Sequence, residues 1–233
     1  MVVIMKFTWL TQAGCLFENE NVTVMVDPYL SDSVGHTDPN KHRRIPVDER
    51  FFDLTPDVIL LTLSHLDHTD PKTLEKFLAR TDKKITVLAA EEAYEKVCGM
   101  GGGHNYVLFA PHTVWNEKGI TFYSVKAEHS DRTAIGVILD DGEKTFYCSG
   151  DTLYNYDVID DVLDLDEAGV DYAFLPINGV GNNMNAKDAA DFAYELGAHK
   201  AVPVHYGLFD SIDPEEFDFE DAMVAEPYME YEI

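Results

Sequence analysis

Basic residues are scarce in this chain. Its 233 residues include 17 lysines and arginines against 43 aspartates and glutamates, which gives a formal net charge of -26. A surface this acidic repels phosphate backbones and anionic lipids at long range. We therefore expect neither nucleic acid nor a membrane as a partner, and the charge favours a small-molecule ligand.

Cysteine is sparse too, and the three cysteines stand far apart, at Cys15, Cys98 and Cys148. Cysteines spaced in this way do not form a metal site from neighbouring residues, and an odd number cannot all pair in disulfides. The apolar start, residues 1–10, is short and lacks a basic leader, so it predicts a first strand rather than a signal peptide. Together these features favour a reduced, cytoplasmic protein. The sequence also lacks repeats, low-complexity segments and obvious linkers, which predicts a single domain over residues 1–233.

Hydrophobic residues make up 45% of the chain, enough for a substantial core. They occur in short runs separated by turn residues. The first runs predict an antiparallel meander of strands over residues 6–28. Residues 57–90 then predict a buried strand over 57–63, a helix that opens at Asp70 and Pro71, and a second strand over 84–90.

The rest of the chain continues the alternation, with a short helix over 91–99, a strand-rich stretch over 105–150, a strand over 171–177, a helix over 186–197 and a strand over 200–205. Two β-rich halves that each carry helices predict an α+β sandwich of sheets flanked by helices. Residues 31–50 are polar and have no period, so they predict a long surface loop, and such loops are often functional.

Histidines and aspartates gather where predicted strands end. Three of them, His65, Asp67 and His68, follow the strand over 57–63, and the ends of three later strands carry His129, Asp151 and His205. Strand ends fix the directions of side chains while the loops beyond them leave a mouth for a substrate. Imidazole and carboxylate ligands together suit zinc, iron or manganese. The pattern therefore predicts a divalent metal centre.

Four motifs carry a resemblance to a known family: "SHLDHTD", "EHSDRTA", "SGDTLY" and "VPVHYG", in this order. Together they resemble the metallo-β-lactamase superfamily. Within it, "SDRTA", "YCSGDTLYNY", "LPING" and "AVPVHYGLF" are most similar to the branch that contains L-ascorbate-6-phosphate lactonase. The resemblance covers nearly the whole chain and implies a four-layer αβ/βα sandwich with a metal centre along one edge of the sheets.

The chain departs from the superfamily at one ligand. The signature His-x-His-x-Asp-His corresponds here to residues 63–68, and Leu63 stands where the first histidine is expected. By resemblance, one intact metal site would be formed by Asp67, His68, Asp151 and His205. A second site would keep His65, His129 and the shared Asp151. We therefore expect one tightly bound metal and a weakened second site, although Leu63 can equally be a core residue of the strand.

The resemblance implies a hydrolase that opens a lactone or ester of a small sugar-like molecule, with a phosphorylated substrate left open. A metal would activate water and polarise the carbonyl group. Asp67 or Asp151 could then accept the proton of the water, and His65 or His129 could protonate the leaving alkoxide. These four residues are the catalytic candidates.

Substrate contacts are predicted at residues near these motifs. Arg132 follows His129 by three residues, and the segment "KHRR", Lys41 to Arg44, adds positive charge to the predicted loop. An anionic substrate group would pair with such side chains. Further candidates are Asn178 and Asn183, as hydrogen-bond donors, and Tyr206, which can point into the site or pack behind it.

Other classes of protein remain to be weighed. Ser64 and Ser149 lack a Gly-x-Ser-x-Gly elbow, which argues against a serine hydrolase. A phosphodiesterase on the same fold is an alternative, and so is a metal-binding protein with little catalytic activity. A homo-oligomer is also left open.

Overall fold

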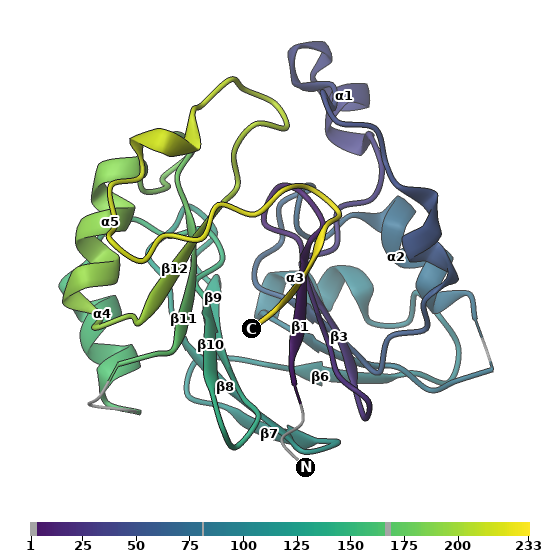
Figure 1. Cartoon of the computed structure of the whole chain (residues 1–233). Coiled ribbons are helices and arrows are strands. Elements are labelled where there is room, and N and C mark those ends of the chain that lie inside the picture. The colour runs from purple at the N-terminus through teal and green to yellow at the C-terminus, as the bar shows by residue number, and fades with distance from the viewer. Residues whose placement is uncertain (1–3, 81, 166–168) are drawn as a thin grey trace.

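Two β-sheets pack face to face in the part of the chain that this computed structural model describes, residues 4–80, 82–165 and 169–233. Residues 1–3 of the predicted first strand lie outside these ranges. Helices cover the outer face of each sheet, α4 and α5 on one side and α2 and α3 on the other (Figure 1). The predicted αβ/βα sandwich is thus confirmed. None of the described helices is long and apolar enough to cross a membrane.

The first sheet combines a short antiparallel part with a parallel part. In spatial order its strands are β13 (Glu230–Glu232), β1 (Lys6–Trp9), β2 (Cys15–Glu18), β3 (Thr23–Val26), β4 (Val58–Leu61), β5 (Thr86–Ala89) and β6 (Asn105–Leu108). The strands from β3 to β6 are parallel. The carboxyl ends of these parallel strands therefore lie at one edge of the sheet.

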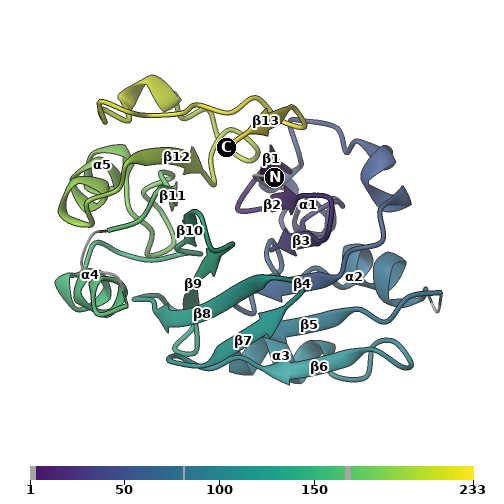
Figure 2. The same cartoon turned by 60° about the horizontal axis from the view of Figure 1, so that its bottom comes forward.

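The second sheet is parallel at the opposite end of its order. Its strands are, in spatial order, β12 (Lys200–Val204), β11 (Tyr172–Pro176), β10 (Thr145–Cys148), β9 (Ile135–Asp140), β8 (Ile120–Lys126) and β7 (Val114–Glu117). The strands β10, β11 and β12 are parallel, and β7, β8, β9 and β10 are antiparallel neighbours. Figure 2 shows that the edge strands β6 and β7 of the two facing sheets lie close together.

Aromatic side chains hold the two sheets together. Phe174 of β11 packs against Phe7 of β1 and Phe17 of β2, with ring centroids 4.7 and 5.2 Å apart, and Phe146 of β10 lies 5.7 Å from Phe17. All four rings are at most 1% exposed. Burial of each such side chain is worth about 1.5–3 kcal/mol, so this interface fixes how the edges of the sheets face each other.

The helices are short: α1 (Ser33–Thr37), α2 (Pro71–Leu78), α3 (Glu91–Val97), α4 (Tyr156–Leu163) and α5 (Ala186–Glu195). As predicted, Asp70 and Pro71 begin α2, because the Asp70 side chain accepts hydrogen bonds from the backbone N–H groups of Lys72 and Thr73. Buried Leu74, Phe77 and Leu78 then face the first sheet.

Several predicted elements differ from the structure. The strand predicted over 57–63 ends at Leu61, so residues 63 and 65 follow the strand instead of alternating along it. The loop predicted over 31–50 contains α1 and the 3-10 helix Pro39–Lys41, and a second 3-10 helix, Glu49–Asp53, begins at its end. Neither the helix α4 nor the edge strand β13 was predicted, and within the strand-rich stretch over 105–150 no separate strand was predicted at β7.

Candidate metal centre

The first three predicted ligands lie in a tight turn between β4 and α2. The N–H groups of His68 and Thr69 both donate to the carbonyl of His65, at 3.1 and 2.8 Å. Because α2 begins at Asp70 with a well-formed cap, the chain must turn within these few residues. His65, Asp67 and His68 are therefore presented together at the carboxyl end of the strand.

The second sheet supplies the other three ligands. His129 follows β8, Asp151 follows β10 and His205 follows β12. Gly150 brings Asp151 close to the first sheet: its φ is +58°, and a Cβ atom there would lie 2.7 Å from the Thr62 hydroxyl. Only glycine combines this backbone conformation with such a close approach.

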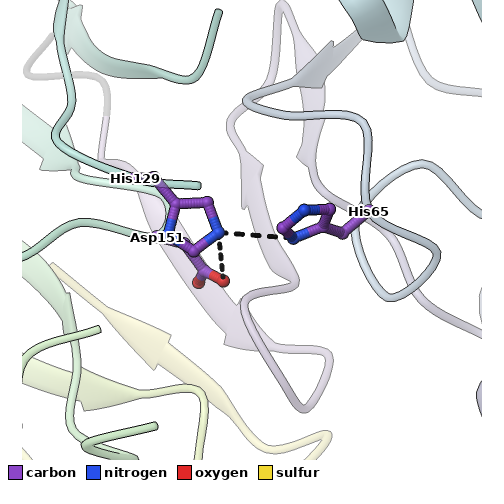
Figure 3. A group of neighbouring side chains, drawn as sticks. All are labelled: His65, His129 and Asp151. Atoms are coloured by element: carbon purple, nitrogen blue, oxygen red, sulfur yellow. Dashed lines mark hydrogen bonds and ion pairs between the residues drawn. The ribbon is translucent and has the colours of Figure 1, made fainter. Parts of the chain in front are cut away.

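The six side chains form two groups of three. The first triad is His65, His129 and Asp151, which is the site predicted to be weakened. The second triad is Asp67, His68 and His205, which belong to the site predicted to be intact. Within each triad the potential ligand atoms lie within 4.8 Å of one another. Figure 3 shows the first triad, with the His129 ring between His65 and Asp151. The Nε2 atom of His129 lies 3.3 Å from Nδ1 of His65 and 3.6 Å from Oδ2 of Asp151.

Asp151 connects the two triads. Its Oδ2 atom lies 3.3 Å from Nε2 of His68, and its Oδ1 atom lies 3.2 Å from Nε2 of His205. Yet Nε2 of His68 and Oδ1 of Asp151 are buried without a hydrogen-bond partner of good geometry. Buried polar atoms are rarely left unpaired. A cation between these atoms would satisfy both, so the donor set fits a divalent metal.

The charges of the second triad support the same conclusion. Burial alone would lower the pKa of His205, but the carboxylates of Asp151 and Asp67 outweigh it and raise the pKa to about 10. Burial would likewise raise the pKa of Asp151, but His205 and His68 hold it well below its ordinary value. Ionised carboxylates thus face protonated imidazoles, and a divalent cation would displace those protons.

The pKa of His65 is shifted in the opposite direction to that of His205. Burial and the neighbouring rings of His129 and His68 lower its pKa from the ordinary value. Its imidazole is therefore mostly neutral at neutral pH, which is the form that binds metals.

Two further residues support the second triad, and the sequence did not reveal them. Asp27, at the end of β3, is fully buried, and its Oδ2 atom lies 2.8 Å from Nδ1 of His68. The Nε2 group of Gln12 donates to Oδ2 of Asp67 at 2.8 Å and lies 3.2 Å from both ring nitrogens of His205. Such partners orient metal ligands and set the tautomer of a histidine.

Left-handed backbone conformations cluster around these residues. Thr11, Gln12, Asp27 and His205 have φ angles of 74, 52, 43 and 59°. Residues other than glycine rarely adopt such angles, and they persist only where the surrounding structure holds them. One such contact is the hydrogen bond from the backbone N–H of His205 to the carbonyl of Gln12, at 2.8 Å.

Leu63, the residue in place of the first signature histidine, is fully buried. It lies beyond the end of β4, and its carbonyl accepts a hydrogen bond from the Thr69 hydroxyl at 2.7 Å. The backbone of Leu63 therefore stabilises the turn that carries His65, Asp67 and His68, and its side chain is buried in the protein interior.

A cavity of about 350 Å³ opens beside the two triads. Ligands from both triads line it, and the remaining wall consists of Gln12, Val34, Lys41, Ser130, Asn178, Val180, Gly181, Asn183, Phe209 and Asp210. The predicted loop over 31–50 thus reaches the cavity through Val34 and Lys41. The Oδ1 atoms of Asn178 and Asn183 are buried and have no hydrogen-bond partner.

Two predicted substrate-binding residues lie away from this wall. Arg132 is exposed and is not among the residues that line the cavity. Tyr206 is also absent from the wall; it is 6% exposed and stacks on Trp9 with ring centroids 4.9 Å apart, so it packs behind His205. Neither residue is therefore in the wall that a substrate in this cavity would contact.

Comparison with known proteins agrees with this geometry. A family model described as a beta-lactamase superfamily domain matches residues 23–206. A UPF0173 metal-dependent hydrolase of Exiguobacterium sp. is 32% identical over 221 residues, which cover 89% of this chain and 88% of that protein. A second UPF0173 metal-dependent hydrolase, from Methanopyrus kandleri, is 29% identical over 98% of this chain and all of its own length.

Among solved structures, a metallo hydrolase of Ignicoccus hospitalis matches 99% of this chain and 98% of its own, with a TM-score of 0.78 and 21% identity. This likeness shows a shared fold. The family model and the curated relatives go further: the chain belongs to the metallo-β-lactamase superfamily, among the UPF0173 metal-dependent hydrolases.

Proposed function

We propose that this metal-dependent hydrolase opens a lactone or ester of a small, hydroxylated, sugar-like molecule. The observation that supports this most is the cavity itself, because ligands of both triads meet the neutral amide side chains of Gln12, Asn178 and Asn183 in a space of about 350 Å³. A cavity near the lower end of the usual range for ligand sites suits a small molecule. The resemblance of motifs such as "SDRTA" and "LPING" to the lactonase branch is a second reason for the proposal.

A divalent metal at the centre would lower the pKa of a water molecule towards neutrality and polarise the carbonyl group of the substrate. The chain supplies the proton acceptors, because Asp67 and Asp151 are ionised and both line the cavity. His65 lines the cavity and His129 does not. Of the two histidines in this triad, His65 is therefore better placed to contact the leaving oxygen. Its neutral imidazole would donate a hydrogen bond to that oxygen, and the proton that Asp67 or Asp151 takes from water would return to the alkoxide.

The walls of the cavity support a substrate with both hydroxyl and apolar parts. Asn178 and Asn183 have buried amide oxygens without partners, and a substrate hydroxyl would satisfy such a group. Val34, Val180 and Phe209 offer apolar surface to the carbon skeleton.

Lys41 is the basic side chain in the cavity wall, and Asp210 lies in the same wall. A phosphate or carboxylate on the substrate would therefore meet one lysine rather than a basic cluster.

Hydrolysis of a phosphodiester is the second candidate. The observation in its favour is that Asp151 lies between the two triads, because paired metals with a shared ligand suit the in-line displacement of a phosphoryl group. A protein that binds metal without turnover is the third outcome, and the same experiment separates all three.

The test compares three substrate classes with one protein. The chain loaded with Mn²⁺ or Zn²⁺ is assayed in a pH-stat with sugar lactones, with the corresponding lactone phosphates, and with bis(p-nitrophenyl) phosphate. We expect lactone opening that His205→Ala abolishes. Faster turnover of the phosphodiester would replace this proposal with the second candidate, and no turnover above the His205→Ala background would favour the third.

A second variant examines the anionic group. Lys41→Met keeps the length of the side chain and removes its charge. If Lys41 binds a phosphate, KM should rise about tenfold or more for the lactone phosphate, as expected for loss of a charge-assisted hydrogen bond. The KM for the uncharged lactone should stay unchanged. Equal effects on both substrates would contradict a role for Lys41 in phosphate recognition.

A further inference from the structure

A buried carboxylate joins the two loops that carry the first triad. Asp131 is 4% exposed. Its Oδ2 atom accepts a hydrogen bond from the backbone N–H of Ser64 at 2.8 Å, and its Oδ1 atom accepts from the backbone N–H and the hydroxyl of Thr133, both at 2.8 Å. The carboxylate thus has a partner for each oxygen, and all of them are donors.

The residues in this contact are close in sequence to two metal-ligand candidates. Ser64 directly precedes His65, and Asp131 follows His129 by two residues. One side chain therefore bridges the immediate neighbours of two ligands in the same triad. Those ligands come from different sheets and approach each other to 3.3 Å (Figure 3).

Residues of the helix α3 also bind both of these loops. The hydroxyl of Ser64 donates to Oε2 of Glu92 at 3.1 Å, and the backbone N–H of Glu92 donates to the Thr133 hydroxyl at 3.1 Å. Lys96 donates to the carbonyl of Ser64 at 2.5 Å. A shift of either loop would break several of these bonds and leave a buried charge unpaired, which is costly.

The second triad is held by other residues. Its ligands are held by Asp27, which contacts His68, and by Gln12, which contacts Asp67 and His205. The described contacts of Asp131 reach none of these five residues.

We propose that Asp131 is a positioning residue that fixes the separation of His65 and His129, and so sets the metal affinity of the His65/His129/Asp151 triad selectively. The proposal rests on metal binding by that triad and does not depend on the substrate proposed above. With leucine at position 63, the triad has three protein ligands, and its affinity depends closely on their geometry.

The experiment isolates each triad before Asp131 is changed. His68→Ala removes a ligand of the second triad and leaves the first complete, and His65→Ala does the reverse. Asp131→Asn is then added to each background. Binding of Co²⁺ is followed by its visible absorption, which reports ligand geometry, and by calorimetric titration; neither measurement needs a substrate.

In the His68→Ala background, Asp131→Asn should weaken Co²⁺ binding about 10- to 100-fold, the usual effect of removing a partner that orients a metal ligand, and should change the absorption spectrum. In the His65→Ala background it should leave both unchanged. Asp27→Asn should give the reverse pattern, lowering affinity in the His65→Ala background.

Two variants serve as controls. Asp141→Asn alters a carboxylate that also accepts two backbone N–H groups, those of Glu143 and Lys144, in a turn between β9 and β10, and it should have no effect on Co²⁺. Thr133→Val removes one donor to Asp131 and should weaken the first triad in the same direction, by a smaller factor, if Asp131→Asn does not fold. Equal weakening in both backgrounds, no weakening in the first, or no Co²⁺ binding by His68→Ala protein would each overturn the proposal.

Discussion

The two triads each bring three side chains together, and Asp151 of the first also lies close to the second, but their supports differ. In the second triad His68 is fully buried, Asp27 contacts its Nδ1 atom, and Gln12 reaches both Asp67 and His205. In the first triad His65 is only half-buried and lines the cavity. His129 is oriented by the carbonyl of Asn182, 3.1 Å from its Nδ1 atom.

The affinity of a metal site depends on what orients the ligands as well as on how many there are. We expect the second triad to bind metal tightly and the first to bind it weakly. The reason is the missing histidine at position 63, because exposure to the cavity is common to both triads: His65 of the first and Asp67 and His205 of the second all line it.

The largest effect should come from removing a ligand of the well-supported triad. His205→Ala takes one of its three ligands and leaves Asp67 and His68 without an opposing imidazole, so metal affinity should fall by at least about a hundredfold. Elemental analysis of the purified protein should show loss of most of its tightly bound metal. His199→Ala changes an exposed histidine that pairs with Asp171 and should retain the metal; an unchanged metal content in His205→Ala would contradict the assignment.

A moderate effect is expected at Leu63. If the weak first triad lacks a ligand, Leu63→His should raise its affinity about tenfold or more and bring the tight stoichiometry from about one metal towards two. Because Leu63 is fully buried, the imidazole should cost about 1–3 kcal/mol of unfolding free energy in the metal-free protein.

Calorimetric titrations of both proteins with Mn²⁺ and Zn²⁺ measure this change. Two tight metals in the unaltered protein would mean that Leu63 does not weaken the first triad. A stoichiometry that Leu63→His leaves unchanged would mean that residue 63, which follows the strand, does not face the metal.

The smallest effect separates the stability of the fold from metal binding. Asp57 lies at the start of β4, at the opposite end from the ligand turn, and pairs with Lys118 and Lys83 at 2.5 and 2.7 Å. Burial would raise the pKa of Asp57, but these lysines and the N–H of Thr23 outweigh it and hold the pKa below 3.8. Because both lysines are partly exposed, the contribution to stability is only about 1–2 kcal/mol.

The sign of the pH dependence follows from this lowered pKa. The stabilisation is present above the pKa of an unfolded aspartate, about 3.9, and is lost as the pH falls through the folded pKa. Asp57→Asn should therefore lower Tm by about 2–8 °C at pH 7, and the difference from the unaltered protein should shrink below about pH 4. Metal content at pH 7 should not change; a loss of metal would show that the two ends of β4 are coupled.

Local patterns in the sequence predicted much of the fold and the six candidate ligands. The ligands could be found because each follows a short apolar run, and a strand end fixes where the next side chains lie. By contrast, β13 has three residues, and its partner β1 is more than 200 residues away in the chain, as shown by the pairing of Lys6 with Glu232. Nothing local marks such a pairing.

The supports of the site were missed for the same physical reason. Asp27 meets His68 across 41 residues of sequence, and Gln12 meets His205 across 193. Only one signal was available: Asp27 carries a carboxylate and directly follows a buried strand, and the predicted ligands are also found where strands end. Arg132 is close to His129 in the sequence, yet it is exposed and is not among the residues that line the cavity, so closeness in sequence does not by itself place a side chain in the cavity wall.

The division of each triad between the two sheets has a consequence for synthesis of the protein. His65, Asp67 and His68 belong to the first half of the chain, whereas His129, Asp151 and His205 belong to the second. A nascent chain on the ribosome exposes its ligands in that order, so neither half can hold a complete triad alone. Binding of a metal by either triad therefore requires both sheets to have assembled, and the second triad requires His205, the last of the six residues in the sequence.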